Sequence, residues 1–146
     1  MRVQILSPES SEDFERYYEL RWRLLREPWQ QPRGSERDAL ESQSIHLMAC
    51  ADAKSPVGVA RLHFNSAEEA QIRYMAVAAD VRGQGIGCAL LEALELRARA
   101  LEAQWIVLNA RERAAGFYAR AGYQVVAAAQ PLFGTIPHVA MRKSLR

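Results

Sequence analysis

A glycine-rich turn at residues 82–87, with the sequence Arg-Gly-Gln-Gly-Ile-Gly, constrains the fold of this chain more than any other feature. It follows a strand-like run at 72–77 and opens a helix-like run that starts at Ile86. Glycine allows positive φ and lets a ligand approach the backbone closely. The first N–H groups of a helix lack internal partners and carry partial positive charge. The turn therefore predicts a binding site for a phosphate or diphosphate group.

Two familiar phosphate loops do not match this turn. The loop of nucleoside triphosphatases ends in Gly-Lys-Ser/Thr, but Gly87 is followed by Cys88 and Ala89, so no lysine is placed to reach a β- or γ-phosphate. A dinucleotide fingerprint needs glycine where Cys88 stands, and too little chain follows for a full doubly wound sheet. A turn that only connects a strand to a helix stays open as the alternative.

Length and composition predict one domain over residues 1–146. The chain is 49% hydrophobic and 25% charged, which is ordinary for a globular protein. A net charge of +2 is too mild to indicate nucleic-acid binding, and no apolar run approaches the roughly 20 residues of a membrane span. Cys50 and Cys88 lie in unlike contexts, which fits a reducing compartment. We expect a cytoplasmic protein with no metal site and with neither nucleic acid nor membrane as partner.

Alternating patterns predict the order β-α-β-β-β-α-β-α-β-β. The predicted strands are 3–6, 45–51, 57–64, 70–77, 105–108, 123–128 and 139–145, with a hairpin turn at 52–56. The first predicted helix starts after Ser10, and the other two span 86–103 and 112–121. In the first helix, the spacing of the large apolar residues predicts a buried face made of Phe14, Tyr18, Trp22 and Leu25. The polar segment 27–43 is long enough to suggest a functional loop such as a lid.

Two motifs at characteristic spacing resemble the GNAT family of N-acetyltransferases over nearly the whole chain. The family pattern Q/R-x-x-G-x-G/A is matched by Arg82, Gly85 and Gly87, after a strand that ends in Ala-Val at 76–77. A second family pattern is an alanine followed by Phe-Tyr and then by Gly-Phe/Tyr. It is matched by Ala114, Phe117-Tyr118 and Gly122-Tyr123. The resemblance implies a mixed α/β fold. In it a six- to seven-stranded sheet has an antiparallel front and a parallel crossover, with helices on both faces.

The resemblance also implies acetyl-CoA as the donor and an amine as the acceptor. The strands at 70–77 and 105–108 would be parallel neighbours that part at their C-terminal ends, and the pantetheine arm would pair there with the backbone of Met75, Ala76 and Val77. The diphosphate would lie on N–H groups of the turn and the start of the helix, with Arg82 nearby. These groups belong to Gly83, Gln84, Gly85, Ile86, Gly87 and Cys88. Tyr118 would be the general acid that protonates the leaving thiolate.

Two departures from the family pattern leave the general base open. Some members carry a glutamate base where this chain has Gln71, whose amide does not accept a proton. Many place a cofactor-binding asparagine where this chain has Arg111, and Asn109 is the nearby substitute. The base candidates are Glu36, Asp38, Glu41, His138 and water. For the three acids in the 27–43 segment, a solvated charge cluster is the alternative interpretation.

Two other functions stay open: a module that binds CoA without transferring an acetyl group, and an acetylator of proteins or peptides rather than of small molecules. An acidic groove would favour basic peptides, but no acidic run appears beyond the mixed segment 36–41. The family resemblance places the acceptor pocket between the regions 22–41 and 131–138. The acceptor itself and the presence of a homodimer stay open.

Overall fold

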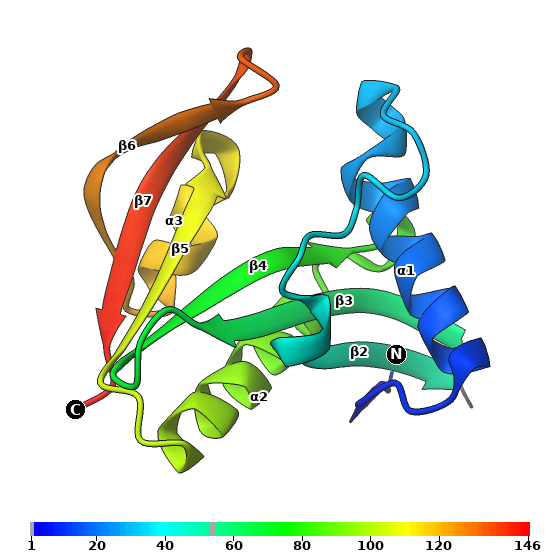
Figure 1. Ribbon diagram of the computed structural model, residues 1–146, viewed down its shortest axis with the longest axis horizontal. Coiled ribbons are helices and arrows are strands. Elements are labelled where there is room, and N and C mark those ends of the chain that lie inside the picture. The colour runs from blue at the N-terminus through cyan, green and yellow to red at the C-terminus, as the bar shows by residue number, and fades with distance from the viewer. Residues whose placement is uncertain (1, 53–54) are drawn as a thin grey trace.

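The alternating segments form one seven-stranded mixed sheet in the computed structural model, which describes residues 2–52 and 55–146 (Figure 1). Its order is β1-β2-β3-β4-β5-β7-β6. The strands are β1 (Gln4–Leu6), β2 (Ile45–Asp52), β3 (Ser55–Phe64), β4 (Glu69–Val77), β5 (Trp105–Arg111), β6 (Gln124–Leu132) and β7 (Ile136–Ser144). Within the described residues, β4 and β5 pair in parallel and the other neighbours pair antiparallel. The expected mixed fold with an antiparallel front and a parallel crossover is confirmed.

The main helices connect these strands, and short 3-10 helices lie between them. The helices are α1 (Ser11–Leu25), α2 (Ile86–Ala100) and α3 (Ala115–Arg120), with 3-10 turns η1 (Glu27–Trp29), η2 (Glu41–Gln43), η3 (Ala79–Val81) and η4 (Glu112–Ala114). The start of α1 is fixed by a capping box, because the N–H of Asp13 donates to Ser10 Oγ at 3.0 Å and the N–H of Ser10 donates to Asp13 Oδ2 at 3.2 Å.

Alternating side chains of β2 place hydrophobic cores on both faces of the sheet. Leu47 and Ala49 join the larger core beneath α2, while Met48 and Cys50 join a smaller core beneath α1. This is the two-residue period of a strand that is covered on both sides. Helix α2 contributes the buried side chains of Leu90, Leu91 and Leu94 to the larger core. Burial of each side chain stabilises the folded state by about 1.5–3 kcal/mol. The predicted helices on both faces are therefore present.

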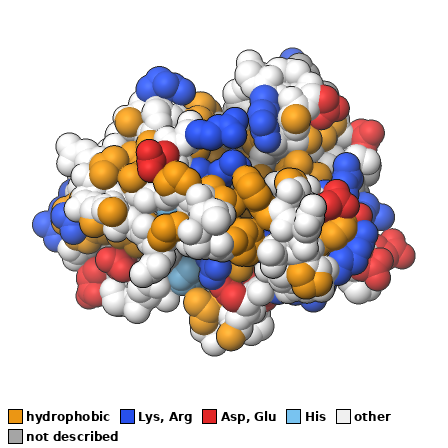
Figure 2. All heavy atoms as spheres, turned by 90° about the horizontal axis from the view of Figure 1, so that it is seen from above, with side chains coloured by type: hydrophobic (Ala, Val, Ile, Leu, Met, Phe, Trp, Pro, Cys, Tyr) orange, Lys and Arg blue, Asp and Glu red, His pale blue; other side chains and the backbone are white. Residues whose placement is uncertain are grey.

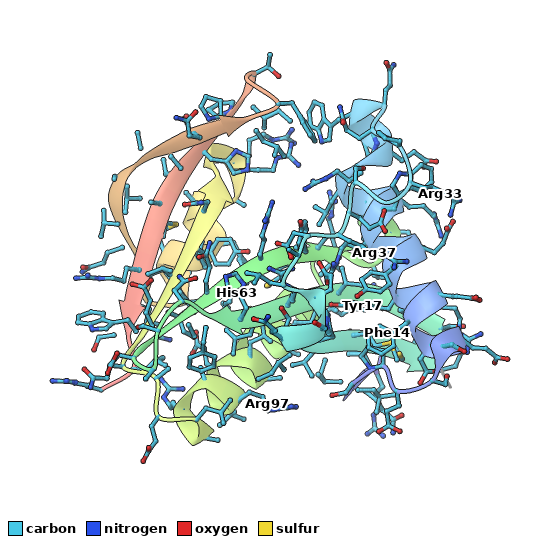
Figure 3. The ribbon with its side chains drawn as sticks, viewed as in Figure 1. Phe14, Tyr17, Arg33, Arg37, His63 and Arg97 are labelled. Carbon is cyan, nitrogen blue, oxygen red and sulfur yellow. The ribbon has the colours of Figure 1, made fainter. Side chains whose placement is uncertain are left out.

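Helix α1 buries a different face from the predicted one. Phe14, Tyr18, Trp22 and Leu25 are only partly buried, whereas Tyr17, Leu20 and Arg21 are buried. The Tyr17 hydroxyl lies 2.9 Å from His46 Nδ1, donates to the Ala60 carbonyl at 3.1 Å, and accepts from Arg21 Nη2 at 2.8 Å. These bonds satisfy the polar atoms that would otherwise oppose burial. Figure 3 shows Tyr17 and Phe14 between α1 and the sheet.

The last two strands are longer than predicted, and β5 runs beyond residue 108 to Arg111. Pro131 lies near the end of β6, an edge strand, and Pro137 near the start of β7, positions where a missing N–H is tolerated. The predicted hairpin between β2 and β3 is confirmed, but its turn includes residues 53 and 54, which lie outside the described residues. No helix in the described ranges is long and apolar enough to cross a membrane.

Candidate active site

Strands β4 and β5 part halfway along their length. They are paired in parallel up to Ile72 beside Leu108. Beyond this point β4 stays beside β3 as far as Val77, while β5 stays beside β7 as far as Arg111. In Figure 1 the half of the sheet with β5, β7 and β6 rises at an angle to the half with β1–β4. The inner edge of residues 75–77 is therefore free of a strand partner, as the resemblance implied.

A β-bulge marks the point of separation. Tyr74 has a φ of 60°, and the β3–β4 register shifts between Val59 and Arg61. Positive φ is strained for a tyrosine, so surrounding contacts must hold it. The Tyr74 ring lies between 4.4 and 5.4 Å from four guanidinium groups, those of Arg21, Arg26, Arg61 and Arg73. The bulge has no sign in the sequence, because nothing in residues 69–77 indicates a break in the strand.

The glycine turn has the conformation that its sequence predicts. Gly83 and Gly85 both have a φ of 81°, and a Cβ on either would meet no heavy atom within 4 Å. Gly85 is the N-cap of α2, and the N–H of Ala89 donates to its carbonyl at 3.0 Å, so the N–H groups just before Ala89 have no partner within the helix. A Cβ on Gly87 would lie 3.2 Å from the Phe117 ring. The third glycine therefore lets α3 pack close to the start of α2.

Side chains around the turn have unequal access to a ligand. Arg82 is exposed, and its Nε donates to the Val77 carbonyl at 3.2 Å, which ties the turn to the free end of β4. Cys88 is exposed on the first turn of α2. Ile86 is only 2% exposed and packs into the core, so only its backbone is available for the predicted cofactor contact.

A cleft of about 490 Å³ occupies the space where the strands part. It brings together Met75 from β4, Asn109 from β5, Tyr118 from α3 and His138 from β7, all predicted from the sequence. Its other walls come from the end of α1, the 27–43 segment and the β6–β7 hairpin. The glycine turn does not line this cleft, so the turn and the cleft are separate regions near the free edge of β4.

Tyr118 is buried at the base of this cleft. It is 9% exposed, and its ring packs against those of Phe117 and Tyr123 at 5.0 and 5.8 Å. Burial raises the pKa of the Tyr118 hydroxyl to about 12. Within the described residues that hydroxyl makes no hydrogen bond. The hydroxyl therefore holds its proton at neutral pH and shares it with no protein group in the described part of the chain.

Asp38 and Glu41 are not solvated carboxylates. Arg61 donates to Asp38 Oδ1 and to Glu41 Oε2, each at 2.7 Å, while Arg73 donates to Asp38 and Arg21 donates to Glu41. Burial acts to raise the pKa of Asp38, but the hydrogen bonds from Arg61 and the Leu40 N–H outweigh it and bring that pKa to about 2. Burial also opposes ionisation of Glu41, but Arg21 and other donors more than offset it, and its pKa is lowered. Such acids are poor proton acceptors.

Glu36 and His138, the other two base candidates, differ in access. Glu36 is 3% exposed and accepts from the Gly34 N–H at 2.7 Å and from Arg37 Nε at 3.1 Å, so it fixes its own loop and does not line the cleft. His138 lines the cleft, and its Nδ1 lies 2.9 Å from the Ile136 carbonyl. A carbonyl partner requires the proton on Nδ1, which leaves Nε2 as a proton acceptor.

His63 also lines the cleft, although no motif in the sequence indicates it. It lies near the middle of the sheet in Figure 3. Its Nδ1 accepts from Arg61 Nη2 at 3.0 Å, and its Nε2 lies 3.2 Å from Asn65 Oδ1. Burial, followed by the charge of Arg61, lowers the pKa of His63. Asn65 in turn donates to Gln71 Oε1 at 2.9 Å. His63 is therefore neutral with both nitrogens engaged.

Comparisons with known proteins agree with this geometry. A model of the GNAT acetyltransferase domain matches residues 26–145. The uncharacterized N-acetyltransferase YjcF of Bacillus subtilis is 32% identical over 112 residues, which cover 77% of this chain and 79% of YjcF.

Solved structures share the fold over the full chain. A predicted N-acetyltransferase from Lactobacillus plantarum superposes with a TM-score of 0.86 at 22% identity, covering 100% of both chains. An aminoglycoside 6'-N-acetyltransferase complexed with coenzyme A superposes with a TM-score of 0.80 at 16% identity, covering 100% of this chain and 98% of the other. The family-model match and the relative that is 32% identical place the chain in a family of known chemistry: it belongs to the GNAT family and is an N-acetyltransferase that uses acetyl-CoA.

Proposed function

We propose that this enzyme transfers the acetyl group of acetyl-CoA to a primary amine by direct attack in a ternary complex. One observation carries the proposal: a buried, protonated Tyr118 hydroxyl without a protein hydrogen bond lines the cleft where β4 and β5 part. A cleft of about 490 Å³ is large enough for the reacting end of the donor and a small acceptor.

The donor-binding residues of this proposal act mainly through their backbone. The free edge of Met75, Ala76 and Val77 would pair with the pantetheine arm, as an added strand does. The N–H groups of residues 83–88 would bind the diphosphate, with Arg82 beside them and Asn109 across the opening. The chain fits this ligand because the glycine turn is exposed and offers unpaired N–H groups. Bound acetyl-CoA supplies an activated thioester.

Tyr118 would act as the general acid of the transfer. The neutral amine nitrogen would form a bond to the acetyl carbon while the carbon–sulfur bond breaks. The nitrogen would then release its second proton to water as the amide forms, and Tyr118 would give its own proton to the departing sulfur. A backbone N–H at the free end of β4 would donate to the acetyl oxygen as negative charge develops there. Bulk solvent returns the proton to Tyr118 after the products leave.

The amine must lose a proton before it attacks, because an alkyl ammonium ion titrates near about 10.4. Of the candidate bases, we propose His138, whose Nε2 is unbonded within the described residues and which lines the cleft. Water is the alternative acceptor. Asp38 and Glu41 are not assigned this role, because arginines hold both carboxylates in their charged form.

A thiol-release assay with acetyl-CoA and a panel of polyamines, aminoglycosides, amino acids and peptides tests the proposal. Tyr118→Phe should lower kcat by about 10²–10⁴-fold with little change in affinity for CoA, because it removes only the acidic proton. An unchanged kcat would overturn the assignment. His138→Gln should also lower kcat, and an unaffected rate would assign the base to water. Binding without turnover across the panel would favour the non-catalytic CoA module.

We also propose a homodimer that forms through β6. This edge strand contains no charged residue, and Val125 and Val126 are each 56% exposed. Edge strands are usually protected by charge or covered, so pairing with β6 of a second copy fits this surface. Sedimentation should show a dimer that Val126→Lys converts to a monomer. A wild-type protein that is monomeric at all concentrations tested would rule the dimer out.

We further propose that residues 1–146 act as one N-acetyltransferase domain in the cytoplasm. The described strands all belong to the same sheet. Cys50 is buried in β2 and Cys88 is exposed on α2, and no disulfide joins them, which fits a reducing compartment. Fractionation of cells that produce the protein tests the location, and recovery outside the cytoplasm would contradict it.

A further inference from the structure

Arg26 is a buried cation without an acidic partner. It follows α1, lines the cleft and is 6% exposed. Its Nε donates to the Ser35 carbonyl and its Nη1 to the Leu25 carbonyl, both at 3.0 Å. Among the described residues, no carboxylate forms a salt bridge with it. Burial of such a cation is costly unless an opposite charge compensates it.

Arg111 is the second cleft-lining arginine for which the described part of the chain offers no acidic partner. It ends β5, at the position where many family members have an asparagine. Its guanidinium lies 5.5 Å from the Trp29 ring, and its buried Nε has no hydrogen-bond partner within the described residues. Arg26 lies 5.4 Å from the Phe133 ring, in the turn between β6 and β7. Each arginine is thus placed against an aromatic ring from another segment of the chain.

The charge that lines the cleft is unbalanced. Its charged side chains are Arg26, Arg73, Arg111 and Asp38, and Asp38 is already engaged by Arg73 and by Arg61 behind it. Figure 2 looks down on the molecule, and blue Lys and Arg side chains gather around the hollow between its two halves. A polycationic acceptor would have to enter this positive field without a free carboxylate to receive it.

We propose that the acceptor is a small amine that also carries a carboxylate, which Arg26 and Arg111 bind while the amine faces Tyr118. This inference rests on the proposed acetyl transfer and names its substrate class. Arginine is suited to a carboxylate because its planar donors match the two oxygens. The cleft volume of about 490 Å³ favours an amino-acid-like molecule over a folded protein.

The same arginines have a second effect on the acceptor. Nearby positive charge disfavours the ammonium form, so it lowers the pKa of the incoming amine. The lower pKa makes it easier for the amine to lose its proton. This matters because Asp38, the carboxylate of the cleft, is bound by arginines and is a poor proton acceptor. The aminoglycoside 6'-N-acetyltransferase that shares this fold is named for a polycationic acceptor class. Fold similarity at 16% identity does not carry that acceptor to this chain.

The experiment compares acceptors that differ in the group at the far end. CoA release is followed with an ω-amino carboxylate, the uncharged alkylamine of the same length and the diamine of the same length. These amines have similar basicity, so differences in rate report recognition of the far end. The amino carboxylate should have a kcat/KM about tenfold to a hundredfold higher than the alkylamine and the diamine. A ratio of this size is what one strong charge-assisted hydrogen bond produces. An ω-amino phosphonate tests whether another anion substitutes.

Variants of the arginines separate recognition from folding and donor binding. Arg111→Gln should reduce the preference for the carboxylate over the alkylamine by about tenfold or more, mainly through KM, and should leave CoA affinity nearly unchanged. Arg113→Gln, at an exposed position on the neighbouring turn, is the matched control and should change nothing. Arg26→Lys, which keeps the charge but not the planar donors, should also weaken the preference.

The outcomes distinguish this inference from the proposed function. Equal rates for the three acceptors, or a preference for the diamine, would overturn the anionic acceptor while leaving acetyl transfer intact. A loss of CoA affinity in Arg111→Gln would instead assign that arginine to the donor. If no amine releases CoA at all, the proposed transfer itself fails.

Discussion

The proposed donor side and the proposed acceptor side of the enzyme are built from different parts of the chain. On the donor side, the chain offers mostly backbone: the free edge of 75–77 and the N–H groups of 83–88, all within fourteen consecutive positions. On the acceptor side it offers side chains from segments far apart in sequence, Arg26 after α1, Asp38 in the connecting loop, and Arg111 and His138 on neighbouring strands. A backbone site needs glycines in a fixed local order, whereas a side-chain site exists only after folding.

The largest expected effect tests whether the acceptor side depends on its buried charges. Arg61→Met should lower the free energy of unfolding by about 3–5 kcal/mol, because Asp38 and Glu41 would be left without their shared partner. Urea denaturation measures this change. Arg33→Met removes the exposed ion pair with Glu19 and serves as the control, with no measurable loss expected. An equal decrease in the free energy of unfolding of the two variants would show that the buried ion pairs do not stabilise this part of the fold.

The next effect is a dependence of stability on acidic pH. The folded-state pKa of Asp38 is about 2, below its ordinary value of 3.8, so its contribution is fully present above 3.8 and is lost as the pH falls through about 2. After allowance for its partial exposure, that contribution is about 1–2 kcal/mol. The stability difference between wild type and Asp38→Asn should therefore shrink as the pH falls from 4 toward 2. A constant difference would mean that the ion pairs do not stabilise the charged form.

A smaller effect on the donor side is protection of Cys88. This cysteine is exposed at the start of α2, whereas Cys50 is buried. Acetyl-CoA should slow alkylation of Cys88 in proportion to the fraction of protein that is bound, as judged by mass spectrometry, because the diphosphate and the reagent compete for the same space. Cys50 in the folded protein should stay unmodified with or without the ligand. Unchanged labelling of Cys88 at saturating acetyl-CoA would place the diphosphate elsewhere.

The same contrast explains how much the sequence alone predicts. The glycine turn and the Phe117-Tyr118 motif are local, so the parallel pairing of β4 with β5, the parting of these strands and the position of Tyr118 in the cleft could be anticipated. The insertion of β7 between β5 and β6 could not, because it depends on pairing between distant segments. The bulge at Tyr74 could not, because a tyrosine inside a regular strand pattern gives no sign of a positive φ.

Buried polar residues account for the error in the buried face of α1 and for the acids that were expected to be solvated. Arg21 and Arg61 are both 0% exposed, yet arginine in a sequence is ordinarily taken as a surface residue. Their burial depends on Asp38 and Glu41, which come from a loop that looked solvated. The buried face of α1 includes Arg21 together with Tyr17, so Tyr17 rather than Tyr18 faces the sheet. Only the folded chain shows such pairings, since the partners lie 20 or more positions apart.

The most direct test of the account is calorimetric titration of acetyl-CoA into the wild type, Gly85→Asp and Gly85→Asn. Aspartate and asparagine have the same size and both tolerate the positive φ of this position, so the pair differs in charge alone. The wild type and Gly85→Asn should bind, and Gly85→Asp should bind at least about tenfold more weakly, because its carboxylate repels the diphosphate. Equal affinity of the two variants, or no detectable binding by the wild type, would contradict a diphosphate site at the start of α2.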